Sequence, residues 1–369
     1  MNYSVESLKT WCSVDLDAVA HNYNYTKKRT DSRVICVVKA GAYGHGAIPV
    51  AKRLVKEGCD FFAVSSIEEA LELRHGGIEC DILILGYILP CHIKDAVEND
   101  ISFSLASCDF AKVLCETALD KKARVHIKLN TGMNRTGFCV CHSEGYDELS
   151  KALEMIKKCD AVKVEGVFSH FAKAEDDKAF SDKQYGFFVN AVDYIKKSGI
   201  TPEIVHICNS AGTANFPDMH FNAVRLGVHL YGCEATDECH VQAMDFCTRI
   251  VDVHELKEGD GVSYGLDFVA DKKMKIAVIG AGYADGIFRS LSDGKDCVVI
   301  GGKRCPIVGR VCMDMTMVDV SDASDAKVGD VAVIWGKELP TQEQAKNAGT
   351  ISYELMCAVS PRVVRVYTE

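Results

Sequence analysis

Apolar and polar positions over the first two thirds of the chain form a repeating series of short apolar runs separated by stretches with helical spacing. Short apolar runs rich in β-branched residues and bounded by polar turns predict buried strands. They lie at residues 33–40, 60–66, 81–87, 101–107, 124–130, 163–171, 203–210 and 222–232. Between most of them apolar residues recur with the period of an amphipathic helix, as at 67–74 and 148–158. These eight alternating units predict an α/β fold, a (β/α)8 TIM barrel with right-handed crossovers.

The pattern changes near residue 248. Helical spacing gives way to strand-like runs separated by Gly, Asp and Lys turns, at residues 250–253, 274–279, 297–301, 308–320 and 331–335. In this region only residues 341–348 have the spacing of a helix. We therefore expect a barrel domain over residues 1–247 and a C-terminal, mostly-β domain over residues 248–369. Residues 10–16 read as a further strand, which could pair with the β domain.

The composition is that of a globular protein. The chain has 369 residues, a formal net charge of −10 and 48% hydrophobic residues. Its Lys and Arg residues are scattered, so they form no basic patch for nucleic acid or an anionic membrane. The longest apolar runs are shorter than the roughly 20 residues that cross a bilayer, and the N-terminus lacks the pattern of a signal peptide. We expect a cytoplasmic protein with no nucleic-acid or membrane partner.

The eighteen cysteines are spread along the chain without a CxxC pair. Their share of about 5% is below the roughly 8 to 10% that is typical of a disulfide scaffold, so reduced and mostly buried thiols are expected. The cluster Cys139-Val140-Cys141-His142 has no second ligand pair at a usable spacing, and no metal site is predicted from it.

A lysine stands at the end of the first predicted barrel strand, on the side of a barrel where active sites form. Lys39 follows apolar residues and precedes a Gly-rich turn that contains Tyr43. A lysine enclosed by apolar residues is costly unless it is paired, neutral or covalently bound. A neutral amine is also what Schiff-base formation requires. For this residue alone, an exposed lysine just past a strand end is an equally good interpretation.

Polar residues follow later strands as well. Arg135 lies in a tight turn after the fifth strand and could bind a carboxylate at two points. His170 ends the sixth strand. The seventh strand ends near Asn209 and Ser210 and the eighth contains Arg225, which together supply groups suited to a phosphate. A core histidine or a structural ion pair would explain each residue singly, but their convergence on one barrel mouth favours a functional site.

Eight motifs occur in the order and spacing of one enzyme family. They are VVKAGAYGHGA, KLNTGMNRTGF, FSHFA, CNSAG, VRLGVHLYG, GVSYG, GYADG and VGRVCMDMTMVDV. Together they cover almost the whole chain, and they resemble the alanine racemase family of pyridoxal 5′-phosphate (PLP) enzymes, built from a TIM barrel and a C-terminal β domain. The resemblance implies an amino-acid racemase, an isomerase that interconverts L- and D-alanine and supplies D-alanine for peptidoglycan.

The resemblance also implies a set of cofactor contacts. Lys39 would hold PLP as a Schiff base, the electron sink for a carbanion at Cα. Arg225 would face the pyridine nitrogen and keep it unprotonated, which restrains transamination. His170 would orient Arg225 and Tyr264. The cofactor-binding positions implied beside Lys39 are Tyr43, His170, Asn209, Ser210, Arg225, Gly227 and Val228.

Racemisation needs a proton acceptor on each face of the planar intermediate. The resemblance assigns Lys39 to one face and Tyr264, from the β domain of a second subunit, to the other. The active site is then shared between two chains, and a homodimer is obligatory. Arg135 and the backbone of Met313 from the second subunit would bind the carboxylate of the substrate, and Asp314 would line the entrance.

Three departures from the family pattern bear on specificity and chemistry. Asn130 and Gly41 stand where the family often has Asp and Asn. Lys128 matches a lysine that many members carbamylate. Pro361 stands where several members have a tyrosine that contacts the phosphate and narrows the substrate pocket. A serine racemase or a broad-specificity racemase is therefore the alternative activity.

Related PLP proteins differ from this chain in residues or in domain organisation. Barrel decarboxylases of diamines and basic amino acids set an acid against the pyridine nitrogen, so Arg225 argues against them. Single-domain PLP-homeostasis proteins lack a β domain, which argues against a pure binding module. Serine racemases linked to glycopeptide resistance keep the catalytic residues and add a membrane domain; a catalytic half of such a protein would look similar to this chain.

Overall fold

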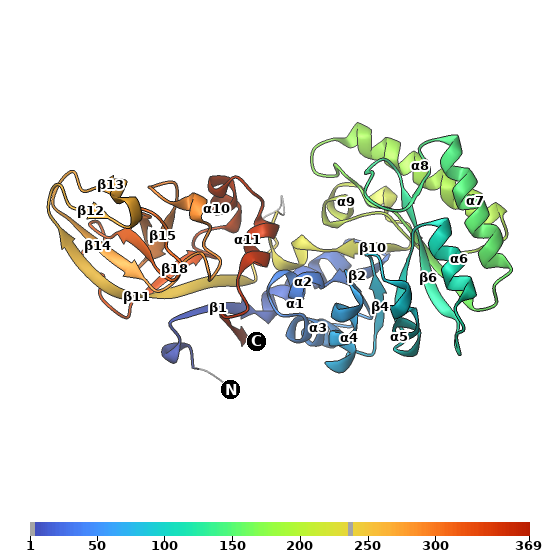
Figure 1. The fold of residues 1–369 in the computed structure, drawn as a ribbon, viewed down its shortest axis with the longest axis horizontal. Helices are drawn as coiled ribbons and strands as arrows, with labels where there is room; N and C mark the ends of the chain where they lie inside the picture. Colours follow the sequence, from blue (N-terminus) through green and yellow to red (C-terminus); the bar gives the residue numbers. More distant parts are fainter. Residues whose placement is uncertain (1–3, 235–238) are drawn as a thin grey trace. The chain divides into compact units, whose positions relative to one another are not determined.

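The computed structural model describes residues 4–234 and 239–369. The chain forms two compact units (Figure 1). The barrel unit consists of Tyr23–Ala42 and Ala47–Leu230, and the β unit of Met1–Asn22, Tyr43–Gly46 and Tyr231–Glu369. The predicted domain border between residues 247 and 248 falls within strand β11 (Met244–Leu256) and stays a prediction.

Eight parallel strands form the barrel unit, which confirms the predicted fold class. Their order is β10-β2-β3-β4-β5-β6-β8-β9. The N–H of Arg225 in β10 donates to the carbonyl of Cys208, just after β9, at 3.1 Å, and this bond links the two ends of the sheet. The strands are β2 (Arg33–Val37), β3 (Phe61–Val64), β4 (Asp81–Ile84), β5 (Ser102–Leu105), β6 (Ala123–Asn130), β8 (Val162–Phe168), β9 (Ile204–His206) and β10 (Ala223–Leu226), with the short β7 (Phe138–Cys139) beside β6.

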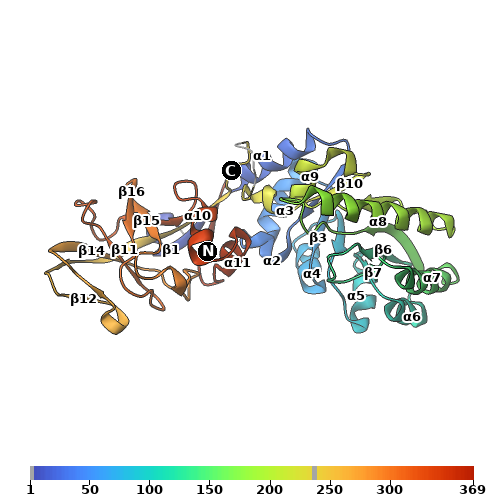
Figure 2. The same ribbon diagram turned by 90° about the horizontal axis from the view of Figure 1, so that it is seen from above.

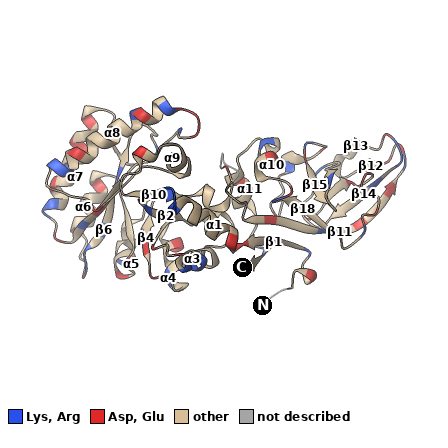
Figure 3. Cartoon of the chain, turned by 180° about the vertical axis from the view of Figure 1, so that it is seen from behind, with Lys and Arg blue, Asp and Glu red and all other residues tan. Residues whose placement is uncertain are grey.

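Helices cover the outside of these strands (Figures 1 and 2). Ser66 and Ser107 begin two of them, because each hydroxyl accepts a hydrogen bond from the backbone N–H three residues later. Acidic and basic residues lie together on the outer helices α7 and α8 (Figure 3). The helices are α3 (Ala47–Lys56), α4 (Ile67–His75), α5 (Ile93–Glu98), α6 (Cys108–Glu116), α7 (Ser143–Lys157), α8 (Lys178–Lys197) and α9 (Ser210–Asn215), and α1 (Leu16–Lys27) leads into this unit from the β unit.

The barrel core is buried on both faces of the sheet. All four residues of β3 and of β5 are buried, as expected for parallel strands with helices outside and packed side chains inside. The interior also contains polar groups: His126 and His206 have no exposed surface, and Arg225 is 2% exposed. Such groups are costly unless they are hydrogen-bonded, so their partners matter for the site.

The β unit is built on a sheet with the order β16-β15-β18-β11-β1-β19, with β14 pairing β11 and β17. The N-terminal strand β1 (Thr10–Asp15) runs antiparallel to β11 and parallel to β19 (Val364–Thr368). This confirms the expected pairing of residues 10–16 with the β domain. The remaining elements include β12 (Gly261–Val262), β13 (Phe268–Val269), β14 (Met274–Ile279), β15 (Cys297–Ile300), β16 (Lys303–Pro306), β17 (Thr316–Asp319), β18 (Val331–Trp335), α10 (Thr341–Ala348) and α11 (Ser352–Ala358).

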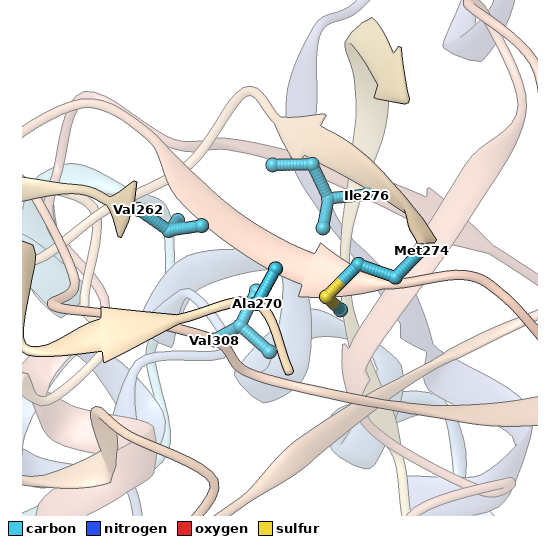
Figure 4. Packing of buried hydrophobic residues seen from close by; sticks show 5 residues of the cluster. All are labelled: Val262, Ala270, Met274, Ile276 and Val308. Carbon is cyan, nitrogen blue, oxygen red and sulfur yellow. The ribbon is translucent and has the colours of Figure 1, made fainter. Parts of the chain in front are cut away.

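One predicted strand of this unit is wrong over most of its length. Residues 308–320 were expected to form a single strand, but β17 covers only Thr316–Asp319. Gly309 has φ +67, and the N–H of Cys312 donates to the carbonyl of Met315 at 3.0 Å, so the chain turns before the strand begins. Val308 is nevertheless a core residue, in a buried cluster made of Val262, Ala270, Met274, Ile276 and Val308 (Figure 4).

Two further features concern the whole chain. The cysteines are free thiols; some, such as Cys36, are buried, whereas Cys91 and Cys357 are exposed, so burial is less general than predicted. Within residues 4–234 and 239–369, no helix is long and apolar enough to cross a membrane, and no group of three or more His, Cys, Asp or Glu side chains is arranged to hold a metal ion.

Candidate active site

Lys39 lies two residues after β2 and begins one turn of left-handed helix. Glycine adopts this conformation readily, whereas each L-residue in it costs roughly 1–2 kcal/mol. Strain of this kind persists where the surrounding structure imposes it, and it clusters at functional sites. The turn directly follows the candidate catalytic lysine. Its positive φ angles are 52° at Ala40, 60° at Gly41, 55° at Ala42 and 53° at Tyr43.

Arg225 is held by hydrogen bonds through both terminal nitrogens. Its Nη1 donates to Nδ1 of His206 at 2.7 Å. Its Nη2, which carries two hydrogens, has three acceptors within hydrogen-bond distance, so two of them share one hydrogen: the carbonyls of Ser169 and Ile207, both at 2.8 Å, and Nδ1 of His170 at 3.0 Å. Burial lowers the pKa of Arg225 to about 10. Among the described residues Nε–H has no hydrogen-bond partner, so this donor remains for a ligand.

The two histidines beside Arg225 are neutral acceptors. Burial, followed by the charge of Arg225, lowers the pKa of both His170 and His206 well below its ordinary value. A neutral imidazole has one N–H and one lone-pair nitrogen. Because a guanidinium only donates, Nδ1 must be the acceptor in both rings. The bond from Arg225 to His170 is the contact that the expected orienting role of His170 requires; the role itself stays a prediction.

Lys128 is a buried amine whose pKa lies far below that of an ordinary lysine. Its Nζ donates to the carbonyl of Leu85 at 2.9 Å and lies 5.4 Å from the centre of the Phe168 ring. Burial lowers the pKa of Lys128 to about 8. Neighbouring positive charges lower it as well, namely those of Arg135, Arg225 and Lys39. All four cations belong to the barrel unit, and the other three act electrostatically on Lys128.

Arg135 lies on the loop after β6, as predicted, and is exposed. Asn130 organises this loop, because its Oδ1 accepts hydrogen bonds from the N–H groups of Gly132 and Asn134 at 3.1 and 2.9 Å. The guanidinium of Arg135 forms no hydrogen bond or ion pair with any residue in the described part of the chain. It is therefore available for an anionic ligand.

The ends of β9 and β10 carry a hydroxyl beside main-chain N–H groups. Ser210 begins α9, and its Oγ accepts a hydrogen bond from the N–H of Gly227 at 2.8 Å. Val228 follows in the turn η4 (Val228–Tyr231). Asn209 caps α9 through its side-chain oxygen, which accepts from the N–H three residues later. This capping role was not anticipated, and a cofactor contact of Asn209 stays a prediction.

The donor set of the barrel unit fits PLP. Lys39 offers a primary amine for the aldehyde, and the hydroxyl of Ser210, whose oxygen accepts from the N–H of Gly227, still has its own hydrogen to donate to the phosphate. The Nε–H of Arg225 offers one hydrogen bond of the kind that an unprotonated pyridine nitrogen accepts.

The residues expected to act from a second subunit lie on the surface of the β unit. Tyr264 is 71% exposed, in the turn that follows Ser263. Ser263 has φ 66 and its Oγ donates to the carbonyl of Arg310 at 2.6 Å, which sets the direction of this turn. Met313 is 53% exposed, and its carbonyl accepts from the N–H of Ala284 at 3.0 Å.

Three other predicted residues also belong to the β unit. Tyr43 is buried, with its ring centre 5.0 Å from that of Tyr231. Asp314 accepts a hydrogen bond from Nη2 of Arg362 at 2.8 Å, an ion pair that sequence reasoning missed. Pro361 is exposed and immediately precedes this arginine.

Sequence reasoning also missed the residues beneath Arg225. His206 was covered only by the strand predicted at residues 203–210, and His126 and Glu165 were given no role, yet all three are buried. The available signal was a polar residue inside an otherwise apolar strand, because burial of such a group requires a partner. That signal indicates a buried polar network, although it does not identify the partners.

Comparison with known proteins identifies the family. Residues 14–235 match the family described as "Alanine racemase, N-terminal domain", and residues 243–367 match "Alanine racemase, C-terminal domain". "Alanine racemase 2" of Caldanaerobacter subterraneus subsp. tengcongensis is 39% identical over 97% of this chain and 94% of its own length. "Alanine racemase" of Methanococcus maripaludis is 38% identical over 97% of this chain and 98% of its own.

Solved structures agree with the sequence matches. Alanine racemase of Clostridium difficile 630 has a TM-score of 0.91 at 36% identity, covering 98% of this chain and 96% of that chain. Alanine racemase from Bacillus anthracis with bound L-Ala-P has a TM-score of 0.91 at 32% identity, covering 100% of this chain and 96% of that chain. The chain therefore belongs to the alanine racemase family.

Proposed function

We propose that this chain interconverts L- and D-alanine with PLP, using Lys39 and Tyr264 of the partner subunit as the two bases. Its family is PLP-dependent. The observation that carries the proposal is a set of cations in the barrel unit, of which Lys128, Arg135 and Arg225 form no ion pair with any residue in 4–234 or 239–369. Such a group favours an anionic ligand, which a phosphorylated cofactor and an amino-acid carboxylate supply. The cations are Lys39, Lys128, Arg135 and Arg225.

Each residue of the proposed site has a separate role in the reaction. PLP, when bound, supplies a ring that stabilises a carbanion at Cα. Arg225 would donate a hydrogen bond to the pyridine nitrogen and keep its own proton, because a guanidinium stays protonated, and this would limit the electron withdrawal that transamination requires. Lys39 moves the proton on one face of Cα, and Tyr264 of the partner subunit moves it on the other. Residues that hold the cofactor are Tyr43, His170, Asn209, Ser210, Gly227 and Val228.

The carboxylate of the substrate is assigned to Arg135 and the backbone of Met313 of the partner subunit. The guanidinium of Arg135 is exposed and unpaired among the described residues, and its planar fork suits two-point binding of a carboxylate. Asp314 is assigned to the entrance of the active site, and its carboxylate forms an ion pair with Arg362. The amine of Lys128, with its lowered pKa, supports carbamylation, since a neutral amine is the form that attacks carbon dioxide.

An exposed apolar surface of the β unit supports a homodimer. Its segments are contiguous, because the N–H of Tyr283 donates to the carbonyl of Cys312 at 3.0 Å and the Sγ of Cys312 lies 3.4 Å from Ser263 Oγ. Large exposed apolar patches mark interaction sites. A symmetric dimer would bury this surface twice. The exposed fractions are 71% for Tyr264, 61% for Leu266, 53% for Met313, 47% for Met315 and 44% for Tyr283.

The proposal is tested by incubating the purified, PLP-loaded enzyme with L-alanine and measuring D-alanine with a D-amino-acid oxidase. Both enantiomers should approach an equal mixture from either side. Removal of PLP should abolish the reaction, and its return should restore it. Release of carbon dioxide from basic amino acids without racemisation would instead identify a decarboxylase.

A serine or broad-specificity racemase is the second candidate. It is favoured by Pro361, whose side chain is smaller than the tyrosine of several family members and has no hydroxyl. A panel of L-amino acids in the same assay separates the two candidates.

A further inference from the structure

A chain of hydrogen bonds runs inside the barrel from Arg225 to a buried carboxylate. Beyond the bond from Arg225 to His206, Nε2 of His206 lies 3.1 Å from Nδ1 of His126. Nε2 of His126 lies 3.4 Å from Oε2 of Glu165, and Ser102 Oγ donates to the same oxygen at 2.6 Å. Every member is at most 6% exposed. Four strands besides β10 contribute to it, so the barrel interior brings these groups together.

The barrel interior leaves room for the two imidazole rings of this hydrogen-bond chain. A Cβ at Gly166 would lie 2.3 Å from Nδ1 of His126, so only glycine leaves room for this ring. The ring of Phe168 stacks on that of His206, with centres 5.0 Å apart and planes at 6°. Both imidazoles are therefore fixed in position by packing, and what remains variable is where their protons lie.

The charge states of the members follow from their surroundings. Burial lowers the pKa of His126 and, more strongly, of His206, so both rings are neutral near neutral pH. Burial alone would raise the pKa of Glu165, but hydrogen bonds from His126 and Ser102, with the charge of Arg124, outweigh it and lower the pKa to about 2. The chain thus ends in a guanidinium, which only donates, and in a carboxylate, which only accepts.

Only one arrangement of protons satisfies every bond between these ends. Nδ1 of His206 accepts from Arg225, so its Nε2 carries the proton and donates to Nδ1 of His126. Nε2 of His126 then carries the second proton and donates to Glu165. Aligned hydrogen bonds of this kind polarise one another, so the carboxylate strengthens Nδ1 of His206 as an acceptor.

We propose that Glu165 is a positioning residue for Arg225, acting through His126 and His206. It aligns the donors and acceptors of both rings in one direction, and it supplies the negative charge that Arg225 lacks among its direct partners. The guanidinium is thereby held in place through its terminal nitrogens, and its Nε–H takes no part in these hydrogen bonds. The catalytic consequence rests on the proposed function, in which that N–H meets the pyridine nitrogen, whereas the proton arrangement does not.

The direct test is histidine-specific 15N NMR of the apoenzyme, which distinguishes the two neutral tautomers from the cation. His126 and His206 should both appear as neutral Nε2–H tautomers across the neutral pH range. Assignment comes from loss of one signal in His126→Gln and of the other in His206→Gln. A cationic ring or an Nδ1–H tautomer at either position in the wild-type protein overturns the proposal, whatever the variants do.

The decisive variant is Glu165→Gln, because its amide has one acceptor and one donor end. Arg124 Nη1 donates to Oε1 of Glu165 at 3.0 Å, so the amide oxygen should take that side and the NH2 group should face His126. The chain would then have a donor at each end, and one bond must be lost. His206 should show a second tautomer, and kcat should fall about tenfold, the effect of one lost buried hydrogen bond. KM for alanine should change little, because the substrate carboxylate is bound elsewhere.

Two further variants distinguish a positioning role of Glu165 from a merely structural one. Glu165→Asp keeps an acceptor-only group and should retain the wild-type tautomers, with kcat closer to wild type than in Glu165→Gln. Glu203→Gln makes the same carboxylate-to-amide change at an exposed ion pair with Lys163, next to β9, and should alter neither tautomer nor kcat. If Glu165→Gln folds with wild-type tautomers and wild-type kcat, the proposal is wrong and the proposed function stands. If the tautomers behave as expected but no racemisation occurs, the proposed function fails and the positioning role of Glu165 stands.

Discussion

The carboxylate of Glu69 accepts a hydrogen bond from the backbone N–H of Ala40 at 2.6 Å. Its other oxygen accepts from the N–H of Ser65 at 2.7 Å. One side chain on α4 therefore binds both the loop that follows β3 and the left-handed turn that follows Lys39. Because residues in that turn are strained, a tie of this kind is needed to hold them.

Replacing Glu69 by Gln should loosen the turn after Lys39. An amide can accept from only one of the two N–H groups, so one bond is lost at a cost of about 1–3 kcal/mol. We expect kcat to fall roughly tenfold, and PLP to dissociate faster, because the lysine is less well positioned. The control is Glu68→Gln, an exposed neighbour on the same helix. Equal effects of the two substitutions would show that the tie has no functional role.

Lys39 should be the residue that binds PLP covalently. Borohydride reduction of the PLP-loaded enzyme should make that link permanent, and peptide mapping should find the label on Lys39. Lys128, a second lysine of the barrel unit, whose pKa is lowered by burial, is the internal comparison. A label on Lys128, or no label at all, contradicts the assignment of Lys39 and with it the proposed mechanism.

Active sites shared between two chains should show complementation. Lys39→Ala and Tyr264→Phe should each be inactive alone. In an equal mixture of reassociated subunits about half of the dimers are heterodimers, each with one intact site, so about one quarter of wild-type activity should return. Heterodimers must be demonstrated independently, for example with two affinity tags. Proven heterodimers without activity would mean that each chain supplies both bases to its own site.

The lowered pKa of Lys128 predicts an unusual dependence of the free energy of unfolding on pH. Its pKa is lowered to about 8 in the folded protein by burial, whereas an unfolded lysine has a pKa of about 10.4. The folded state therefore disfavours the charged form at a cost of about 3 kcal/mol, fully present below pH of about 8 and relieved as pH rises toward about 10.

Lys128→Met should accordingly stabilise the protein near neutral pH in carbonate-free buffer. The gain should be about 2 kcal/mol, because the lost bond to the Leu85 carbonyl offsets about 1 kcal/mol of it. The difference should shrink as pH rises above about 8. Urea unfolding at several pH values measures it, with Lys163→Met, on an exposed lysine, as control. A gain that does not change with pH would mean that Lys128 is not the group that titrates.

The comparison of sequence and structure separates two kinds of information. The barrel strands could be predicted because parallel strands buried on both faces appear as short apolar runs. Lys39 and Arg225 could be singled out because they stand at strand ends, where barrels place reactive groups. The turn at Gly309 was missed because the apolar residues on both sides of it looked like one strand.

Contacts across the barrel could not be predicted in the same way. His126 and Glu165 are 39 residues apart, and Ala40 and Glu69 are 29 apart. Which interior side chains meet depends on the register and tilt of the strands, which no local pattern contains. Residues that position other residues are therefore found in the structure, whereas residues at strand ends are found in the sequence.

Pro361 lies in a well-supported turn of the β unit. The N–H of Val363 donates to the carbonyl of Ser360 at 3.0 Å, which places Pro361 at the second position of a β-turn, where proline is favoured but not required. Arg365 Nη1 donates to the carbonyls of Ser360 and Val363, both at 2.7 Å, and these two bonds stabilise the turn. Pro361→Tyr should therefore cost little stability, about 0.4–1 kcal/mol through the unfolded chain.

This variant tests whether position 361 sets substrate choice. If the tyrosine fills space beside the substrate side chain and bonds the phosphate, Pro361→Tyr should raise the preference for alanine over serine and tighten PLP binding. One added group in a pocket changes discrimination by roughly 10-fold to 200-fold. The wild-type preference, measured as a ratio of kcat/KM values, should be small by comparison. Pro361→Ala, which removes the ring without adding a hydroxyl, should leave selectivity near wild type. A wild-type enzyme that already rejects serine by several thousand-fold, or a Pro361→Tyr variant with unchanged selectivity, would show that other residues close the pocket.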